Sequence, residues 1–155
     1  MFHLVLFHPE IPHNAGAAGR LAVATGARLH LIEPLGFSLD EKHVRRTGLD
    51  YWQYVDLRVW KDLDELKAAA DPGARFWYLS TKATAAYWDA PIADGDYFVF
   101  GPESRGLPES LLRAHPEETL RIPMPGPRAR SLNLSTSVGI VLYEGMRRLA
   151  TSHAS

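Results

Sequence analysis

FGPESRGLP, residues Phe100–Pro108, and RIPMPGPRARSLNLS, residues Arg121–Ser135, are two glycine- and proline-rich turns, and one apolar helical pattern follows them as far as Glu144. The first turn follows the apolar run DYFVF and the second follows the short run TLRIP, so each begins where a predicted strand ends. In an open α/β sheet, the carboxyl ends of the strands form the usual ligand edge. We therefore expect both turns to lie at that edge and to bind a ligand.

Outward from these turns, short apolar runs of strand length alternate with helical patterns. The other runs are HLVLF, RLHLIE, YVDLRVW and RFWYLS. Helices are expected over Asn14–Thr25, from a capping box of Ser38 and Glu41, over Asp62–Ala70 and over Pro108–Ala114. This alternation predicts an α/β fold with a mostly parallel sheet and helices on its faces.

The composition predicts one soluble domain over residues 1–155, because 46% of the residues are hydrophobic and 23% are charged. No run is long enough to span a bilayer, and MFHLVLFHPE is expected to form the first strand rather than a secretory signal. The chain has no cysteine, which excludes disulfides, thiolate metal sites and cysteine nucleophiles and favours a cytoplasmic location.

A net charge of −1 argues against binding nucleic acid by overall charge, so any contact with RNA must use local clusters of basic residues. Two such clusters are Lys42, Arg45 and Arg46, and then Arg121, Arg128 and Arg130. For the first cluster, solvated surface charges are the favoured interpretation. The second flanks a glycine/proline loop, which favours a binding role.

Other common sites fit poorly. The loop HPEIPHN is too long for the tight turn of a dinucleotide site, and Gly16 and Gly19 lack its G-x-G pair. The histidines His3, His8 and His13 lack the helical spacing of a zinc motif, so we expect no metal. No G-x-S-x-G elbow of a serine hydrolase occurs.

Near the N-terminus, Asn14 and Arg20 are six residues apart, so both could face the ligand edge if Asn14 caps the helix. A guanidinium amid Ala, Gly and Leu is well suited to holding a phosphate. The alternative is a simple cap and a surface charge. Glu103 is the carboxylate of the first glycine/proline turn, and it could equally pair with Arg105.

Together, NAGAAGR, FGPESRGLP and IPMPGPRARSLNLSTSVGIVLYE resemble, in the right order, the three motifs of the SpoU-type (SPOUT) RNA 2′-O-ribose methyltransferases. The short chain and the stretch KHVRRTGLDYW are similar to the small subfamily that methylates the wobble ribose of tRNA. This resemblance implies an α/β fold with a C-terminal trefoil knot, S-adenosylmethionine as the cofactor and a homodimer in which Arg20 completes the partner's site.

Carried over residue by residue, the resemblance also implies the site. The catalytic positions are Arg20, Asn14, Glu103 and Asn133, and the cofactor contacts are Leu79, Gly101, Ile122 and Ser131. A side chain at Gly101 is expected to enter the ligand's space. Arg20 is expected to orient the ribose hydroxyl, because a guanidinium is a poor base, while Glu103 assists the proton or holds Arg20.

The expected function is therefore methylation of the wobble ribose in a tRNA anticodon loop. A short loop presents its 2′-hydroxyl more openly than a duplex does and needs few phosphate contacts. Two alternatives stay open: the same reaction at another tRNA or rRNA position, and a noncatalytic RNA-binding module.

Overall fold

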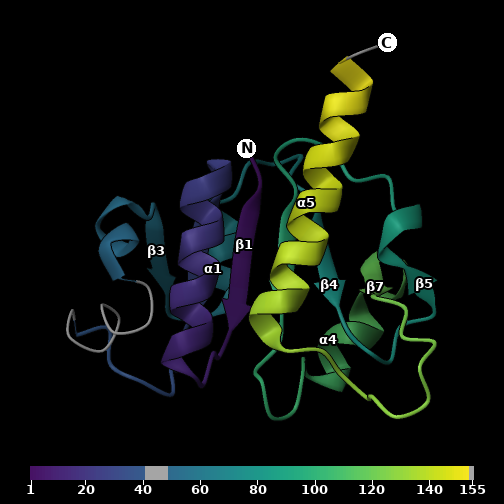
Figure 1. Ribbon diagram of the computed structural model, residues 1–155, viewed down its shortest axis with the longest axis horizontal. Coiled ribbons are helices and arrows are strands. Elements are labelled where there is room, and N and C mark those ends of the chain that lie inside the picture. Colours follow the sequence, from purple (N-terminus) through teal and green to yellow (C-terminus); the bar gives the residue numbers. More distant parts are fainter. Residues whose placement is uncertain (41–48, 154–155) are drawn as a thin grey trace.

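A parallel sheet forms the centre of the computed structural model, which describes residues 1–40 and 49–153 (Figure 1). Within these residues the sheet has seven strands in the order β3-β2-β1-β6-β4-β7-β5, and every strand pair is parallel. The strands are β1 His3–Phe7, β2 Arg28–Ile32, β3 Leu57–Trp60, β4 Phe76–Leu79, β5 Ala85–Ala86, β6 Tyr97–Phe100 and β7 Thr119–Arg121. The expected parallel α/β architecture is confirmed.

The helices lie on both faces of the sheet. They are α1 Pro12–Thr25, α3 Leu63–Ala69, α4 Glu109–Ala114 and α5 Leu134–His153, with 3-10 turns η1 Leu49–Tyr54, η2 Tyr87–Asp89 and η3 Pro116–Glu118. Helices α1 and α5 lie side by side on the face that is nearer the viewer in Figure 1. In the described residues, no helix is long and apolar enough to cross a membrane.

Alternate residues of each strand serve two separate cores, because successive side chains of a strand point to opposite faces. Leu4 and Leu6 of β1 pack under α1 and α5, whereas Val5 packs on the opposite face with Leu63 and Leu66 of α3. These side chains are almost fully buried, and each such leucine or valine stabilises the fold by about 1.5–3 kcal/mol.

A polar pair, the buried His30 and the half-buried His3, interrupts the second core. His3 Nδ1 lies 2.9 Å from His30 Nε2, and Trp60 Nε1 donates to His30 Nδ1 at 2.9 Å. Since His30 Nδ1 accepts, its Nε2 donates to His3, so both rings are neutral. Burial is the main reason that the pKa of His3 falls to about 4 and that of His30 to about 3.

The structure differs locally from the sequence-based expectations. The predicted strand YVDLRVW begins only at Leu57, because Trp52 and Val55 instead pack against α1 and the chain turns there as η1. The short strand β5 was not expected. Glu41, its capping box and the first basic cluster lie outside the described residues.

Candidate functional site

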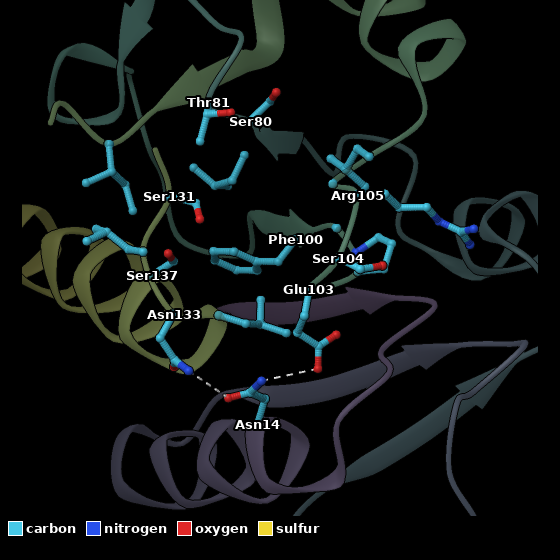
Figure 2. Close-up of a pocket in the computed structure, with 18 of the residues that line it drawn as sticks. Asn14, Ser80, Thr81, Phe100, Glu103, Ser104, Arg105, Ser131, Asn133 and Ser137 are labelled. Carbon is cyan, nitrogen blue, oxygen red and sulfur yellow. Dashed lines mark hydrogen bonds between the residues drawn. The ribbon is translucent and has the colours of Figure 1, made fainter. Parts of the chain in front are cut away.

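A cavity of about 470 Å³ opens at the carboxyl ends of β4, β6 and β7 (Figure 2). Its walls come from residues 79–82, from the turn after β6 and from the segment between β7 and α5. The two glycine/proline turns therefore meet at the ligand edge of the sheet, as expected. A volume of this size is typical of small-molecule sites.

The cavity brings together seven of the eight residues expected to form the site. They are Asn14, Leu79, Gly101, Glu103, Ile122, Ser131 and Asn133. The lining also includes residues that the sequence analysis did not assign to the site, among them Ile11, Ser80, Thr81 and Ser104. Ser80 ends the predicted strand RFWYLS and Thr81 follows it, so the rule that located the two turns could also have found them.

Three of the expected catalytic residues form one hydrogen-bonded chain. Asn133 Nδ2 donates to Asn14 Oδ1 at 3.3 Å, and Asn14 Nδ2 donates to Glu103 Oε2 at 3.2 Å. Figure 2 shows Asn14 lying between the other two side chains. Asn14 is only 3% exposed, so this chain fixes its amide at the cavity wall.

Asn133 also fixes the start of α5. Its Oδ1 accepts hydrogen bonds from the backbone amides of Ser135 at 2.9 Å and Thr136 at 3.3 Å. This is the bonding of a helix N-cap, in which an asparagine is among the favoured residues. Asn133 therefore ties the helix end to Asn14 on α1.

Glu103 joins the cavity turn to the chain before α1. Its carboxylate accepts from the amide of Glu10 at 2.9 Å and from that of Ile11 at 2.7 Å, besides Asn14. A negative charge at this end also stabilises the helix dipole. The carboxylate of Glu103 thus bonds to α1 and to the residues just before it, and not to Arg20 or Arg105.

The carboxylate of Glu10 makes the return contact. Glu10 Oε1 accepts from the backbone amide of Ser104 at 2.8 Å and from its hydroxyl at 2.7 Å. The amide of Ser104 is the main reason that the pKa of Glu10 is lowered. Glu10 was not among the residues expected from the sequence, because nothing local indicates that its partner lies more than ninety residues away.

Gly101 allows the cavity turn to fold back on itself. A Cβ atom at Gly101 would lie 2.4 Å from the backbone nitrogen of Leu107 and 2.5 Å from the carbonyl carbon of Gly106. Gly106 itself has φ of +71°, in the left-handed region that favours glycine. The expectation that a side chain at Gly101 enters ligand space is therefore corrected: it would first meet the turn's own backbone.

Asn14 does not cap α1. The N-cap is Ile11, Pro12 occupies the first turn, and Asn14 lies inside the helix. Proline is well suited to that place, since its φ is already helical and it has no amide to satisfy. The side chain of Asn14 is consequently free to bond with Glu103 and Asn133.

Arg20 is the expected site residue that the cavity does not include. It is exposed on α1, and its guanidinium carbon lies 4.8 Å above the centre of the Tyr51 ring. A spacing of six residues turns the helix by about 600°, so Arg20 points away from the direction of Asn14. Arg20 therefore does not line the cavity of its own chain, and the condition that Asn14 caps the helix is not met.

The second basic cluster is divided by the fold. Arg128 and Arg130 are exposed on the segment that leads to α5, whereas Arg121 is half-buried at the end of β7. Arg128 and Arg130 are therefore accessible to bind a phosphate, whereas Arg121 is less accessible. Among the described residues, no group of three or more His, Cys, Asp and Glu side chains could hold a metal ion.

Comparison with known proteins gives consistent results for the whole chain. Residues 1–143 match the SpoU rRNA Methylase family. A tRNA (cytidine(34)-2′-O)-methyltransferase of Burkholderia ambifaria is 48% identical over 150 residues, which cover 96% of each chain. The corresponding enzyme of Escherichia coli K12 is 47% identical over 150 residues, 96% of this chain and 94% of that one.

A solved structure gives the same picture. This structure comes from work on the 2-OH methylation of C/U34 on tRNA. It superposes on this chain with a TM-score of 0.92 and is 50% identical in sequence, over 97% of both chains. An rRNA methyltransferase from Sinorhizobium meliloti, solved with S-adenosylmethionine bound, has a TM-score of 0.80 and 25% identity over 96% of this chain and 56% of its own.

Proposed function

Because the chain belongs to the SpoU rRNA methylase family, we propose that it methylates the 2′-hydroxyl of the wobble nucleotide, position 34, of tRNA. The observation that carries this proposal is full-length similarity to enzymes named for this reaction, together with a cavity that gathers seven expected site residues. The base at position 34 would be cytidine or a modified uridine.

The cavity is suited to S-adenosylmethionine as the methyl donor. When bound, this cofactor supplies an activated methyl group on a sulfonium. The residues that would hold it come from the ends of β4, β6 and β7 and from the segment before α5, namely Leu79, Gly101, Ile122 and Ser131. The close approach of residues 101 and 106–107 keeps the cavity turn tight, so its backbone groups are fixed before any ligand arrives.

The chain's own contribution to the reaction is then mainly positioning. The bonded set Asn133, Asn14 and Glu103 holds the cavity wall where the ribose would enter. Holding an attacking oxygen at near-attack distance lowers the barrier substantially without a metal or a strong base. The carboxylate of Glu103 already accepts three hydrogen bonds from this chain, which suits it to holding α1 in place.

Arg20 is proposed to act in the cavity of a second copy of the chain, in a homodimer. It lies on the exposed side of α1, outside its own cavity, so a site that uses it needs another subunit. There its guanidinium would orient the ribose hydroxyl and a neighbouring phosphate, as a fork of five donors can. Arg128 and Arg130 would add phosphate contacts at the cavity edge.

Three further properties belong to the same proposal. The segment from residue 122 to residue 133 would thread the chain into a trefoil knot, since it brings Ser131 beside the turn after β6 before α5 returns across the sheet. Residues 1–155 would act as a single methyltransferase domain. Its work would be done in the cytoplasm, where tRNA is processed.

The direct test is transfer of a labelled methyl group to tRNA from cells that lack this gene, followed by mass spectrometry of the product. We expect one 2′-O-methyl group at nucleotide 34. Methylation at another tRNA or rRNA position would reject the substrate and keep the reaction. Binding of tRNA with no methyl transfer would instead favour the noncatalytic RNA-binding module.

A further inference from the structure

Tyr51 on η1 lies directly beside Arg20 on α1. The guanidinium carbon of Arg20 is 4.8 Å from the centre of the Tyr51 ring, within the range of a cation–π interaction. The Tyr51 side chain is 39% exposed, so the pair lies at the surface. A long arginine side chain at a surface is otherwise free to adopt many rotamers.

The turn that carries Tyr51 is docked firmly on α1. A Cβ atom at Gly19 would lie 2.8 Å from Cζ3 of Trp52 and 3.2 Å from Cγ2 of Val55, so both side chains rest on the bare helix backbone. Trp52 and Val55 also pack against the main core. Tyr51 is therefore held next to Arg20 by the fold, because its neighbour Trp52 cannot move without uncovering the core.

A ring partner restricts the arginine and still leaves its donors free. A guanidinium over an aromatic ring uses its face, whereas its N–H groups point outward in its plane. A carboxylate partner would instead occupy those N–H groups and cancel the charge. The Tyr51 ring thus gives a preorganised arginine whose donors remain available for a phosphate or a hydroxyl.

We propose that Tyr51 is a positioning residue for Arg20, which makes η1 part of the methyl-transfer apparatus. The proposal deepens the proposed function and rests on it, since it needs Arg20 to act on the ribose. Tyr51 acts through the face of its ring and does not line the cavity of its own chain. Its effect should appear in kcat and vanish when Arg20 is absent.

The test is a set of variants assayed with S-adenosylmethionine and unmodified tRNA. Tyr51→Leu should lower kcat roughly two- to fivefold, the amount that an exposed cation–π contact contributes. Tyr51→Phe keeps the ring and should stay within about twofold of the wild type. Tyr54→Leu is the matched control, because Tyr54 lies on the same turn and is 72% exposed, and its kcat should be unchanged.

The double variant Arg20→Ala/Tyr51→Leu separates positioning from general stability. If Tyr51 acts through Arg20, the double variant should turn over no more slowly than Arg20→Ala alone. An equal loss in both backgrounds, or a loss in Tyr51→Phe as large as in Tyr51→Leu, would overturn the proposal. A change confined to KM for tRNA would overturn it as well, since that indicates direct RNA binding.

These outcomes are distinct from failure of the proposed function. A wild-type protein that transfers no methyl group to tRNA rejects the function itself. An active wild type with an impaired Arg20→Ala variant, but an additive effect of Tyr51→Leu, rejects only the role of Tyr51.

Discussion

The carboxylates of Glu10 and Glu103 each accept a backbone hydrogen bond from the segment that carries the other residue. Glu103 accepts the backbone amide of Glu10 at 2.9 Å, and Glu10 accepts the amide of Ser104, the residue after Glu103, at 2.8 Å. Each carboxylate accepts a backbone N–H group, and these dipoles offset the repulsion between the two negative charges. The turn that lines the cavity is thereby fastened to the entry of α1.

Loss of the Glu10 carboxylate should loosen the cavity turn. In Glu10→Ala the amide and hydroxyl of Ser104 lose a charged acceptor, and we expect affinity for S-adenosylmethionine to fall roughly three- to tenfold. Titration calorimetry measures this, with the exposed Glu117→Ala on η3 as the control. Unchanged affinity would mean that other contacts hold the turn.

Gly101→Val should abolish cofactor binding by displacing the turn's backbone. A Cβ atom at this position would lie 2.4 Å from the backbone nitrogen of Leu107, which a small side-chain movement cannot relieve. Gly73→Val is the matched control, because a Cβ atom there meets no atom within 4 Å and Gly73 lies outside the cavity. Calorimetry on both proteins, after circular dichroism has shown that they are folded, decides the point. If a folded Gly101→Val protein bound the cofactor with wild-type affinity, the assignment of the cofactor to this cavity would be rejected.

Arg20→Ala should lower turnover by on the order of 10²-fold with nearly normal affinity for the cofactor, as for a donor used only in the transition state. Affinity for the cofactor should stay nearly normal because Arg20 lies outside the cavity of its own chain. Arg20→Lys should remain impaired, because an ammonium group lacks the planar fork. Single-turnover rates and calorimetry give the two quantities separately. A near-normal rate in Arg20→Ala would refute the role.

Mixing two inactive homodimers tests whether Arg20 acts across subunits. After exchange between Arg20→Ala and Gly101→Val proteins, half of the dimers are mixed and each mixed dimer has one complete site, so about a quarter of wild-type activity should return. If Arg20 acted within its own chain, each mixed dimer would contain no complete site. An active monomer in light scattering would contradict the dimer directly.

The histidine pair predicts a loss of stability in mild acid. In the folded protein the pKa of His3 is lowered to about 4 and that of His30 to about 3, mainly by burial, from an ordinary value of 6.5. Below pH 6.5 the unfolded chain therefore binds more protons than the folded one. Stability is fully present above that pH and is lost as the pH falls toward 4 and 3, by up to about 1.4 kcal/mol per pH unit for each histidine.

Urea denaturation of wild type and His30→Gln at pH 7.5 and 5.5 measures this loss. The variant should lose less stability between the two pH values, because only the half-buried His3 ring remains to be protonated. His13→Gln provides the matched substitution at an exposed position. Equal losses in wild type and His30→Gln would show that the pair of histidines does not govern the acid response.

The sequence by itself determined the fold class and the place of the cavity. Alternating apolar runs, such as HLVLF and DYFVF, identified strands, because a strand with both faces covered must be apolar along its length. The turns after residues 100 and 121 could be recognised from glycine and proline alone. Both signals are local, since turn chemistry and side-chain periodicity act over a few residues.

Only the tertiary structure decided which distant groups meet. The sheet order placed β6 between β1 and β4, which brought Glu103 to Asn14 and Glu10 and made Glu103 a partner of α1 rather than of Arg20 or Arg105. It also turned Arg20 out of its own cavity toward Tyr51 and gave Gly101 its close contact with Leu107. Each of these relations joins segments whose pairing depends on long-range packing, and the free energy of that packing is not encoded in any local pattern of residues.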